Sequence, residues 1–305
     1  MIQKILLNIL TGLYLLLHGI ISGIVKQVLP YTYRCKSVKN ELVLVTGSGS
    51  GIGKLMAKKF ALLGAKIICV DINQTANSKT CAEIKNEGGE AVAFKCDLSK
   101  REEIYSLADN VIKNVGYPDI LINNAGIVTG KKFLDSPDEM IEKTFQVNTL
   151  SHFWLAKKFL PNMIEKNHGH LVTIASCAGM FGAAGLVDYC SSKFAAVGFD
   201  EALRNELLRI EKTGVKTTVV CPNVINTGMF QGFKVAGLPL LEPEYVADKV
   251  VEAVLTNQEL LMLPRMTYFL WCLKTILPYK FASFLDKDVM RLCHSMDQFV
   301  GRKSD

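Results

Sequence analysis

A glycine-rich turn between two short apolar runs places the strongest constraint on how this chain can fold. Residues 41–46 (ELVLVT) form the first run, and the sequence GSGSGIG follows directly at positions 47–53. A helical stretch comes next, and then a second apolar run at 65–70 that leads into Asp71. Strand, glycine turn, helix and strand in this order predict the first unit of a parallel sheet with a crossover helix.

The turn and Asp71 together have the chemistry of a dinucleotide site. Glycines let the backbone approach a pyrophosphate, and the N-terminus of the following helix stabilises its negative charge. Asp71 lies 18 residues after Gly53, where a carboxylate accepts hydrogen bonds from ribose hydroxyls and repels a 2′-phosphate. No Lys or Arg lies within the turn or directly after Asp71 to bind such a phosphate. The sequence therefore predicts an NAD site in preference to an NADP site.

Apolar strands and helices continue to alternate through the rest of residues 41–265. Strands are expected near 91–95, 120–122, 171–175 and 215–221, and helices near 82–87, 101–114, 138–163 and 189–210. This alternation predicts an α/β fold, a single Rossmann-like doubly wound parallel sheet with helices on both faces.

Three side chains between residues 176 and 193 suit proton transfer. Tyr189 and Lys193 are four residues apart, so they project from one face of a helix that begins near Tyr189. A phenol has a reference pKa of about 10, and a nearby ammonium lowers that pKa by favouring the phenolate. Ser176 can hydrogen-bond the same substrate oxygen. The spacing alone is usual for a solvated helix face, and the upstream dinucleotide unit is what favours a catalytic site.

An apolar segment without a formal charge precedes the glycine turn. Residues 5–25 have about the length of a membrane-spanning helix. More basic residues follow the segment than precede it, which predicts a following domain that faces the cytosol. A helix lying in the membrane surface and a core helix of a soluble protein are the alternatives. A signal peptide is disfavoured, since no small-residue cleavage site is evident.

Charge and cysteine content exclude several functions. Five of the six excess positive charges lie within residues 1–40, so the rest of the chain is nearly neutral and is not expected to bind nucleic acid. The nine cysteines are scattered and form no Cys-x-x-Cys pair, so no metal site is predicted. Their odd number also disfavours a disulfide scaffold and indicates reduced thiols.

Four motifs in this order resemble the short-chain dehydrogenase/reductase family. They are TGxxxGxG at 46–53, NNAG at 123–126, Ser176, and Tyr-x-x-x-Lys at 189–193. The resemblance covers about residues 40–265. Within the family the chain is similar to a membrane-associated group of retinol and 17-beta-hydroxysteroid dehydrogenases, on the sequences at 123–139, 167–176, 189–199, 226–230 and 294–300.

The family resemblance implies a role for each candidate residue. Tyr189 would be the general acid/base, Lys193 would bind the nicotinamide ribose and lower the tyrosine pKa, and Ser176 would orient the substrate oxygen. Asn148 would hold a water in the proton path. The candidate cofactor-binding residues are Gly47, Ser50, Gly51, Ile52, Gly53, Asp71, Asp97 (adenine), Asn124, Ala125, Gly126, Tyr189, Lys193, Pro222 and Thr227 (nicotinamide carboxamide).

One position departs from the family pattern. Asn223 follows Pro222 where the family usually has glycine. Asparagine tolerates a left-handed backbone better than most residues, so we expect a similar turn there.

The sequence predicts four parts. These are a membrane anchor at 1–29, a basic linker at 30–40, the catalytic domain at 41–265, and an apolar extension at 266–305. Pro278 should interrupt the helix expected within the extension. The extension would cover the substrate pocket, contact the bilayer, or do both.

The resemblance implies an enzyme that transfers hydride between NAD and a lipophilic alcohol, with all-trans-retinol as the first candidate. A 17-beta-hydroxysteroid or another lipid alcohol is the alternative substrate. A non-enzymatic lipid-droplet or membrane scaffold is a third possibility, which the intact Ser176, Tyr189 and Lys193 disfavour. The resemblance also implies a homodimer. We expect a location at the endoplasmic reticulum membrane or lipid droplets, with the catalytic domain in the cytosol.

Overall fold

The computed structural model describes residues 2–28, 34–232, 240–284, 287–288, 294–297 and 299–300. The chain divides into two compact units, Met1–Ser37 and Val38–Asp305. The first unit contains helix α1 (Ile2–Val28), which exposes apolar side chains such as Leu6, Leu10, Leu13 and Leu17. None of the helices within the described ranges combines the length and the hydropathy that a bilayer crossing requires.

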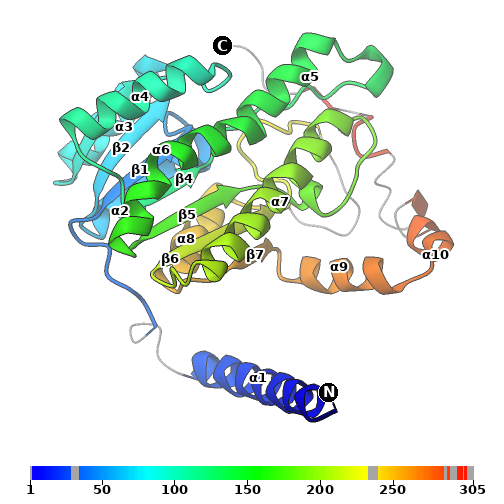
Figure 1. Cartoon of the computed structure of the whole chain (residues 1–305). Coiled ribbons are helices and arrows are strands. Elements are labelled where there is room, and N and C mark those ends of the chain that lie inside the picture. The colour runs from blue at the N-terminus through cyan, green and yellow to red at the C-terminus, as the bar shows by residue number, and fades with distance from the viewer. Residues whose placement is uncertain are drawn as a thin grey trace. The chain divides into compact units, whose positions relative to one another are not determined.

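Within the described residues, the second unit contains one sheet of seven parallel strands (Figure 1). The strands are β1 (Leu42–Thr46), β2 (Lys66–Asp71), β3 (Glu90–Lys95), β4 (Ile120–Asn123), β5 (Gly169–Ile174), β6 (Val215–Pro222) and β7 (Leu260–Leu263). Their order is β3-β2-β1-β4-β5-β6-β7. The order reverses between β1 and β4, and ligands of such sheets bind beyond the carboxyl ends of the strands at this reversal.

Helices cover both faces of the sheet (Figure 1). One face carries α2 (Gly51–Leu62), α3 (Gln74–Asn86) and α8 (Pro243–Leu255), and the other carries α4 (Arg101–Asn114), α6 (Ser151–Lys166) and α7 (Val187–Arg209). Side chains of a strand alternate between faces, so Leu44, Leu121 and Leu171 all point toward α6, where they pack against Leu155 and Phe159. Burying a side chain of this size contributes about 1.5–3 kcal/mol. The predicted doubly wound sheet is confirmed.

The helix predicted at 138–163 contains an irregularity that the sequence pattern does not indicate. It consists of α5 (Asp138–Phe145), a π-helical turn (Gln146–Leu150) and α6. Single π turns inside helices are rare and are frequent at functional sites. Asn148 lies within this turn and is fully buried.

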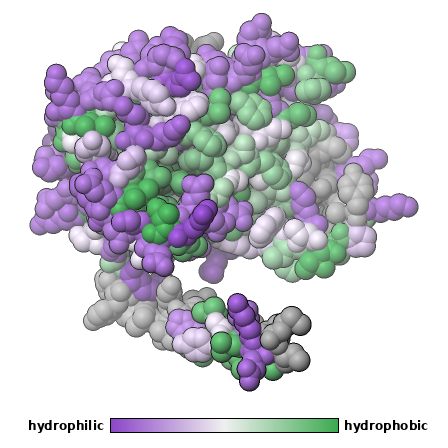
Figure 2. All heavy atoms as spheres, viewed as in Figure 1, coloured by the Kyte–Doolittle hydropathy of each residue, from purple (hydrophilic) through white to green (hydrophobic). Residues whose placement is uncertain are grey.

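Two further helices follow β7. Pro278 separates α9 (Met266–Ile276) from α10 (Tyr279–Phe284), as predicted. The hydroxyl of Tyr268 donates to Leu260 O (2.7 Å), and Lys274 Nζ donates to Met180 O (2.7 Å), so α9 is bonded to β7 and to the segment that follows β5. Figure 2 shows hydrophobic side chains over these helices at the lower right, and the exposed ones include Met266, Phe269, Ile276, Phe281 and Phe284.

Candidate active site

The glycine turn is a tight cradle that only small residues can form. A Cβ atom on Gly53 would lie 2.1 Å from Gly47 O, and Gly47 itself has a φ of +67°. Ser50 precedes α2 without a side-chain capping hydrogen bond. The first backbone amides of a helix have no partners within the helix, so this end of α2 is suited to an anion.

The carboxylate of Asp71 is held beside the turn at the end of β2. Its Oδ2 accepts a hydrogen bond from Gly49 N (2.9 Å), and its Oδ1 accepts one from Asn73 N (2.8 Å). Because both oxygens are fixed by backbone amides, the negative charge has a defined position next to the cradle. The cradle and the carboxylate fit the pyrophosphate and the ribose of a dinucleotide.

Asn124 joins the turn to the end of β4. Its Nδ2 donates to Thr46 O (2.7 Å), while its backbone N donates to the Thr46 hydroxyl oxygen (2.9 Å). The same hydroxyl accepts from Ala125 N (3.1 Å) and donates to Ile122 O (3.2 Å). These bonds hold together the two strand ends that flank the reversal of strand order.

One cavity of about 410 Å³ brings together almost all of the predicted site residues. It is lined by Gly47, Ser50, Gly51, Ile52, Gly53, Asp71, Asp97, Asn124, Ala125, Gly126, Ser176, Tyr189, Lys193, Pro222 and Thr227. Thr227 lies across from the turn, since a Cβ atom on Gly51 would be 3.5 Å from its methyl carbon. Although burial opposes it, hydrogen bonds from Ser99 hold the pKa of Asp97 below its ordinary value.

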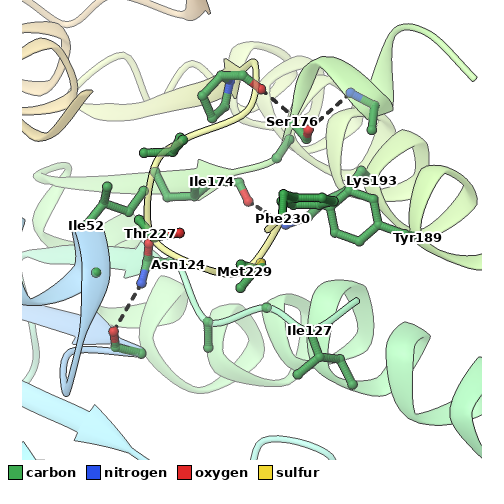
Figure 3. Close-up of a pocket in the computed structure, with 18 of the residues that line it drawn as sticks. Ile52, Asn124, Ile127, Ile174, Ser176, Tyr189, Lys193, Thr227, Met229 and Phe230 are labelled. Atoms are coloured by element: carbon green, nitrogen blue, oxygen red, sulfur yellow. Dashed lines mark hydrogen bonds between the residues drawn. The ribbon is translucent and has the colours of Figure 1, made fainter. Parts of the chain in front are cut away.

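Tyr189 and Lys193 lie on neighbouring turns of α7, and Ser176 follows β5 (Figure 3). Lys193 Nζ donates to Ile174 O (2.8 Å) and lies 5.8 Å from the centroid of the Tyr189 ring. The Ser176 hydroxyl donates to Pro222 O at 3.4 Å, a long and weak contact. A substrate oxygen in the cavity can therefore replace that contact.

Burial controls the titration of the two ionisable groups. It raises the pKa of Tyr189, while a hydrogen bond with Ser176 acts in the opposite direction. Burial also lowers the pKa of Lys193 to about 8. Burial is thus the largest influence on the pKa of Tyr189 in the protein without cofactor, and the lowering by Lys193 that the resemblance implies stays a prediction.

Asn148 lies behind the cavity and connects two of its walls. Its Nδ2 donates to Ile127 O (2.9 Å) and Ser192 Oγ (3.0 Å), and its Oδ1 accepts from Ile127 N (2.8 Å). Ser192 Oγ in turn donates to Tyr189 O (2.7 Å). The side chain thus positions the loop after β4 against the first turn of α7. The water-holding role implied by the resemblance stays a prediction.

The prediction of a left-handed turn at Asn223 is wrong. Asn223 is not among the residues with a positive φ, and its N donates to Leu263 O (2.7 Å). This bond extends the pairing of β6 with β7, in which Pro222 lies opposite Leu263. This hydrogen bond to β7 satisfies the amide of Asn223 without a left-handed conformation.

No individual residue of the apolar wall of the cavity was predicted from the sequence. This wall includes Phe181, Leu186, Met229, Phe230 and Leu270. The Phe230 ring packs edge-on against Tyr189 with centroids 5.3 Å apart. Because Phe230 follows the predicted cofactor-binding residue Thr227 by only three positions, the sequence could have indicated that it lies near the cavity. Met229 and Phe230 belong to the loop 229–241, of which residues 233–239 lie outside the described residues.

A dinucleotide cradle and a Ser, Tyr and Lys set in one cavity define a nicotinamide-dependent oxidoreductase. The sequence profile described as short chain dehydrogenase matches residues 41–235. The chain belongs to the short-chain dehydrogenase/reductase family, as the four motifs predicted.

Curated relatives align over most of their length. Human epidermal retinol dehydrogenase 2 is 49% identical over 272 residues, which cover 88% of each chain. Human estradiol 17-beta-dehydrogenase 11 is 44% identical over 301 residues, or 99% of each chain. Rat retinol dehydrogenase 10 is 42% identical over 275 residues, covering 80% of this chain and 81% of the relative.

Solved structures share the fold. A short-chain dehydrogenase/reductase from Burkholderia phymatum in complex with NAD has a TM-score of 0.71 and 24% identity, covering 79% of this chain and 94% of that chain. A metagenomic short-chain oxidoreductase in complex with NADP has a TM-score of 0.64 and 28% identity, covering 75% and 97%. Since one structure contains NAD and the other NADP, the likeness does not distinguish the two cofactors.

Proposed function

We propose that the protein oxidises a lipophilic alcohol, all-trans-retinol, to its aldehyde with NAD⁺. The observation that carries the proposal is the apolar wall beside Tyr189, because it suits a long hydrocarbon and keeps water from the reacting carbon. The relatives named as retinol dehydrogenases, at 49% and 42% identity, support the same substrate class.

The chain's own residues would handle the proton and the orientation of the substrate. When bound, NAD⁺ supplies the hydride acceptor and a positive charge near the phenol. Tyr189 accepts the hydroxyl proton of the alcohol while the carbinol carbon gives up its hydride. Ser176 orients the reacting oxygen, and Lys193 binds the cofactor ribose beside it. The product is an aldehyde or, from a secondary alcohol, a ketone.

A 17-beta-hydroxysteroid is the alternative substrate. A relative named estradiol 17-beta-dehydrogenase 11 matches 99% of this chain, and the same site chemistry oxidises a secondary alcohol. Membranes that contain the protein should be assayed with NAD⁺ and a panel of retinol, estradiol and a long-chain fatty alcohol. We expect the highest kcat/KM with retinol. A clear preference for estradiol would replace the first substrate with the second, and no turnover of any alcohol would contradict the proposed activity.

The fixed carboxylate of Asp71 supports NAD over NADP. Close like charges disfavour binding by several kcal/mol, and each 1.4 kcal/mol is a factor of ten. We expect kcat/KM with NAD⁺ to exceed that with NADP⁺ by at least about tenfold. The variant Asp71→Ala combined with Ile72→Arg should narrow this ratio, while Glu87→Ala, which removes an exposed acid at the C-terminal end of α3, should leave it unchanged. Equal use of both cofactors by the unmodified protein would contradict the preference.

Residues 1–29 attach the protein to a membrane in this proposal. Support comes from the exposed leucines of α1 and from the basic residues that follow it, which suit an anionic cytosolic leaflet. Residues 30–33 of the basic linker lie outside the described residues. The second apolar surface, on α9 and α10, is proposed to add a weaker contact.

Deleting residues 1–29 should move much of the protein from the membrane pellet to the supernatant. The cofactor fold should persist, because β1 begins only at Leu42. The double variant Leu10→Asp with Leu13→Asp should also move protein to the supernatant. Leu62→Asp, which changes an exposed leucine of α2, should leave the distribution unchanged. Fractionation followed by carbonate extraction measures the effect. A full-length protein that is wholly soluble without detergent would rule out the anchor.

The cellular location and the assembly state follow from the same proposal. The protein resides at the endoplasmic reticulum membrane or on lipid droplets, with the catalytic unit in the cytosol, and it forms a homodimer. Co-localisation with markers of both compartments, protease protection of sealed microsomes, and light scattering of the detergent-solubilised protein test these three statements.

A further inference from the structure

In the segment 294–300, Met296, Phe299 and Val300 lie beside the part of the active site that contains Tyr189 and Phe230, far in sequence from the residues they contact. Residue 298 is outside the described residues. Val300 N donates to Gln231 O (2.9 Å), directly after Phe230. Met296 packs on the buried cluster formed by Leu186, Tyr189 and Cys190. This segment therefore touches the catalytic tyrosine's own packing cluster.

An aromatic chain joins the segment to the catalytic ring. The Phe299 ring lies 6.3 Å from the Phe230 ring, which in turn packs edge-on against Tyr189 at 5.3 Å. Phe230 lines the cavity, as Leu186 does. Phe299 and Met296 thus act on the cavity through two residues that face the substrate.

Two glycines in other loops make room for the segment. A Cβ atom on Gly130 would lie 2.0 Å from Phe299 Cε1, and one on Gly185 would lie 3.1 Å from Met296 Cβ. Gly130 also has a φ of +67°, and Gly185 has a φ of +75°. The loop after β4 and the loop before α7 therefore both adopt backbones that accommodate these two side chains.

We propose that Phe299 and Met296 are positioning residues for the large apolar substrate: they hold Phe230 and Leu186 in place beside Tyr189. This inference rests on the proposed function only for the choice of alcohol. Without the segment, Phe230 loses its ring contact with Phe299, and the cluster of Leu186, Tyr189 and Cys190 loses its contact with Met296. The apolar wall then binds a long hydrocarbon less well, while the cofactor cradle, at the other end of the cavity, is unaffected.

The first experiment replaces Phe299 with alanine in the full chain. We expect KM for retinol to rise about tenfold, since aromatic contacts and their fixed geometry are lost, with kcat changed less than about threefold. KM for NAD⁺ should not change. A control variant, Phe133→Ala, removes an exposed phenylalanine of the 3-10 turn Phe133–Asp135 and should leave all three constants unchanged. Unchanged KM for retinol in Phe299→Ala would overturn the proposal.

The second experiment perturbs the same contact from the other side. Gly130→Ala should raise KM for retinol, because its Cβ displaces Phe299. Gly88→Ala is the matched control: Gly88 has a φ of +85° but no neighbour within 4 Å, so it has the backbone strain without the clash. The double variant Gly130→Ala with Phe299→Ala should have a KM for retinol no higher than that of Phe299→Ala alone. Effects that multiply instead would show that the two residues act independently and would overturn the contact.

A measurement without turnover separates this inference from the proposed function. In Phe299→Ala, backbone amides in 183–190 and 229–232 should exchange hydrogen for deuterium faster than in the unmodified protein, while those of the glycine turn keep their rates. If the unmodified protein oxidises no alcohol yet exchange increases in these segments, the proposed function fails and the positioning role stands. Unchanged exchange in both segments would overturn the positioning role.

Discussion

Replacing Tyr189 with phenylalanine should lower kcat by about a thousandfold or more, while NAD⁺ still binds. The ring and its packing against Phe230 persist in this variant, but no group remains to accept the alcohol proton. General acid/base catalysis typically contributes about 10² to 10⁴ in rate. Among the described residues that line the cavity, Tyr189 is the only one from α7 that has a hydroxyl group, so α7 offers no replacement for the phenol there. Steady-state kinetics give kcat, and calorimetric titration gives the affinity for NAD⁺.

Tyr105→Phe is the matched control for this experiment. Tyr105 is a half-buried tyrosine of α4 that packs edge-on against Trp154 at 6.4 Å, away from the cavity. The variant Tyr105→Phe should keep the turnover of the unmodified protein, which would show that removing a phenolic oxygen away from the cavity does not lower activity. Near-normal turnover in Tyr189→Phe would refute the proton-transfer role of Tyr189.

Replacing Lys193 with methionine should abolish most activity and yet stabilise the cofactor-free protein at neutral pH. Burial lowers the pKa of Lys193 from an ordinary value of 10.5 to about 8. The folded state therefore binds this proton less tightly than the unfolded state, which costs roughly 3 kcal/mol of stability wherever the lysine is charged in both. Losing the hydrogen bond to Ile174 O offsets about 1 kcal/mol of the gain, so a net stabilisation of about 2 kcal/mol is expected.

The sign of the pH dependence gives a second test of the same variant. Below pH 8 the full penalty is present, because Lys193 is protonated whether the chain is folded or not. Between pH 8 and 10.5 the folded state has lost the proton that the unfolded state still holds, so the penalty declines as the pH rises. Urea unfolding should give Lys193→Met a higher free energy of unfolding than the unmodified protein at pH 7, but not at pH 10. Lys249→Met, on a surface lysine, should show neither effect, and a less stable Lys193→Met at pH 7 would refute the argument.

The parts of the site that depend on local sequence could be predicted. The glycine turn, Asp71 and the Tyr189–Lys193 spacing each lie within one strand–turn–helix or one helix, so their chemistry follows from short-range geometry. The alternation of apolar runs is equally local, and it was enough to predict a doubly wound sheet. The edges of elements were less certain: α3 begins at Gln74, well before the expected 82–87, since the capping side chain of Asn73 starts it.

The parts that depend on packing between distant segments could not be predicted. The pKa of Tyr189 depends on how completely other elements bury it, and no spacing along α7 gives that. Asn223 does not adopt a left-handed backbone, because its amide bonds to β7, a strand about 40 residues further on that was not predicted from the sequence. The contact of Phe299 with Gly130 joins two segments that lie far apart in the sequence.

The π-helical turn at Gln146–Leu150 also determines which changes in length this region can tolerate. An α-helix turns about 100° per residue, and a π turn contains one extra residue, so every side chain after it is rotated by about that angle. As a result α5 packs on α7, whereas α6 turns Leu155 and Phe159 toward α4 and the sheet. Deleting one residue here would keep the helix but rotate those two side chains out of the core. For this stretch, the number of residues is as strict a requirement as their identity.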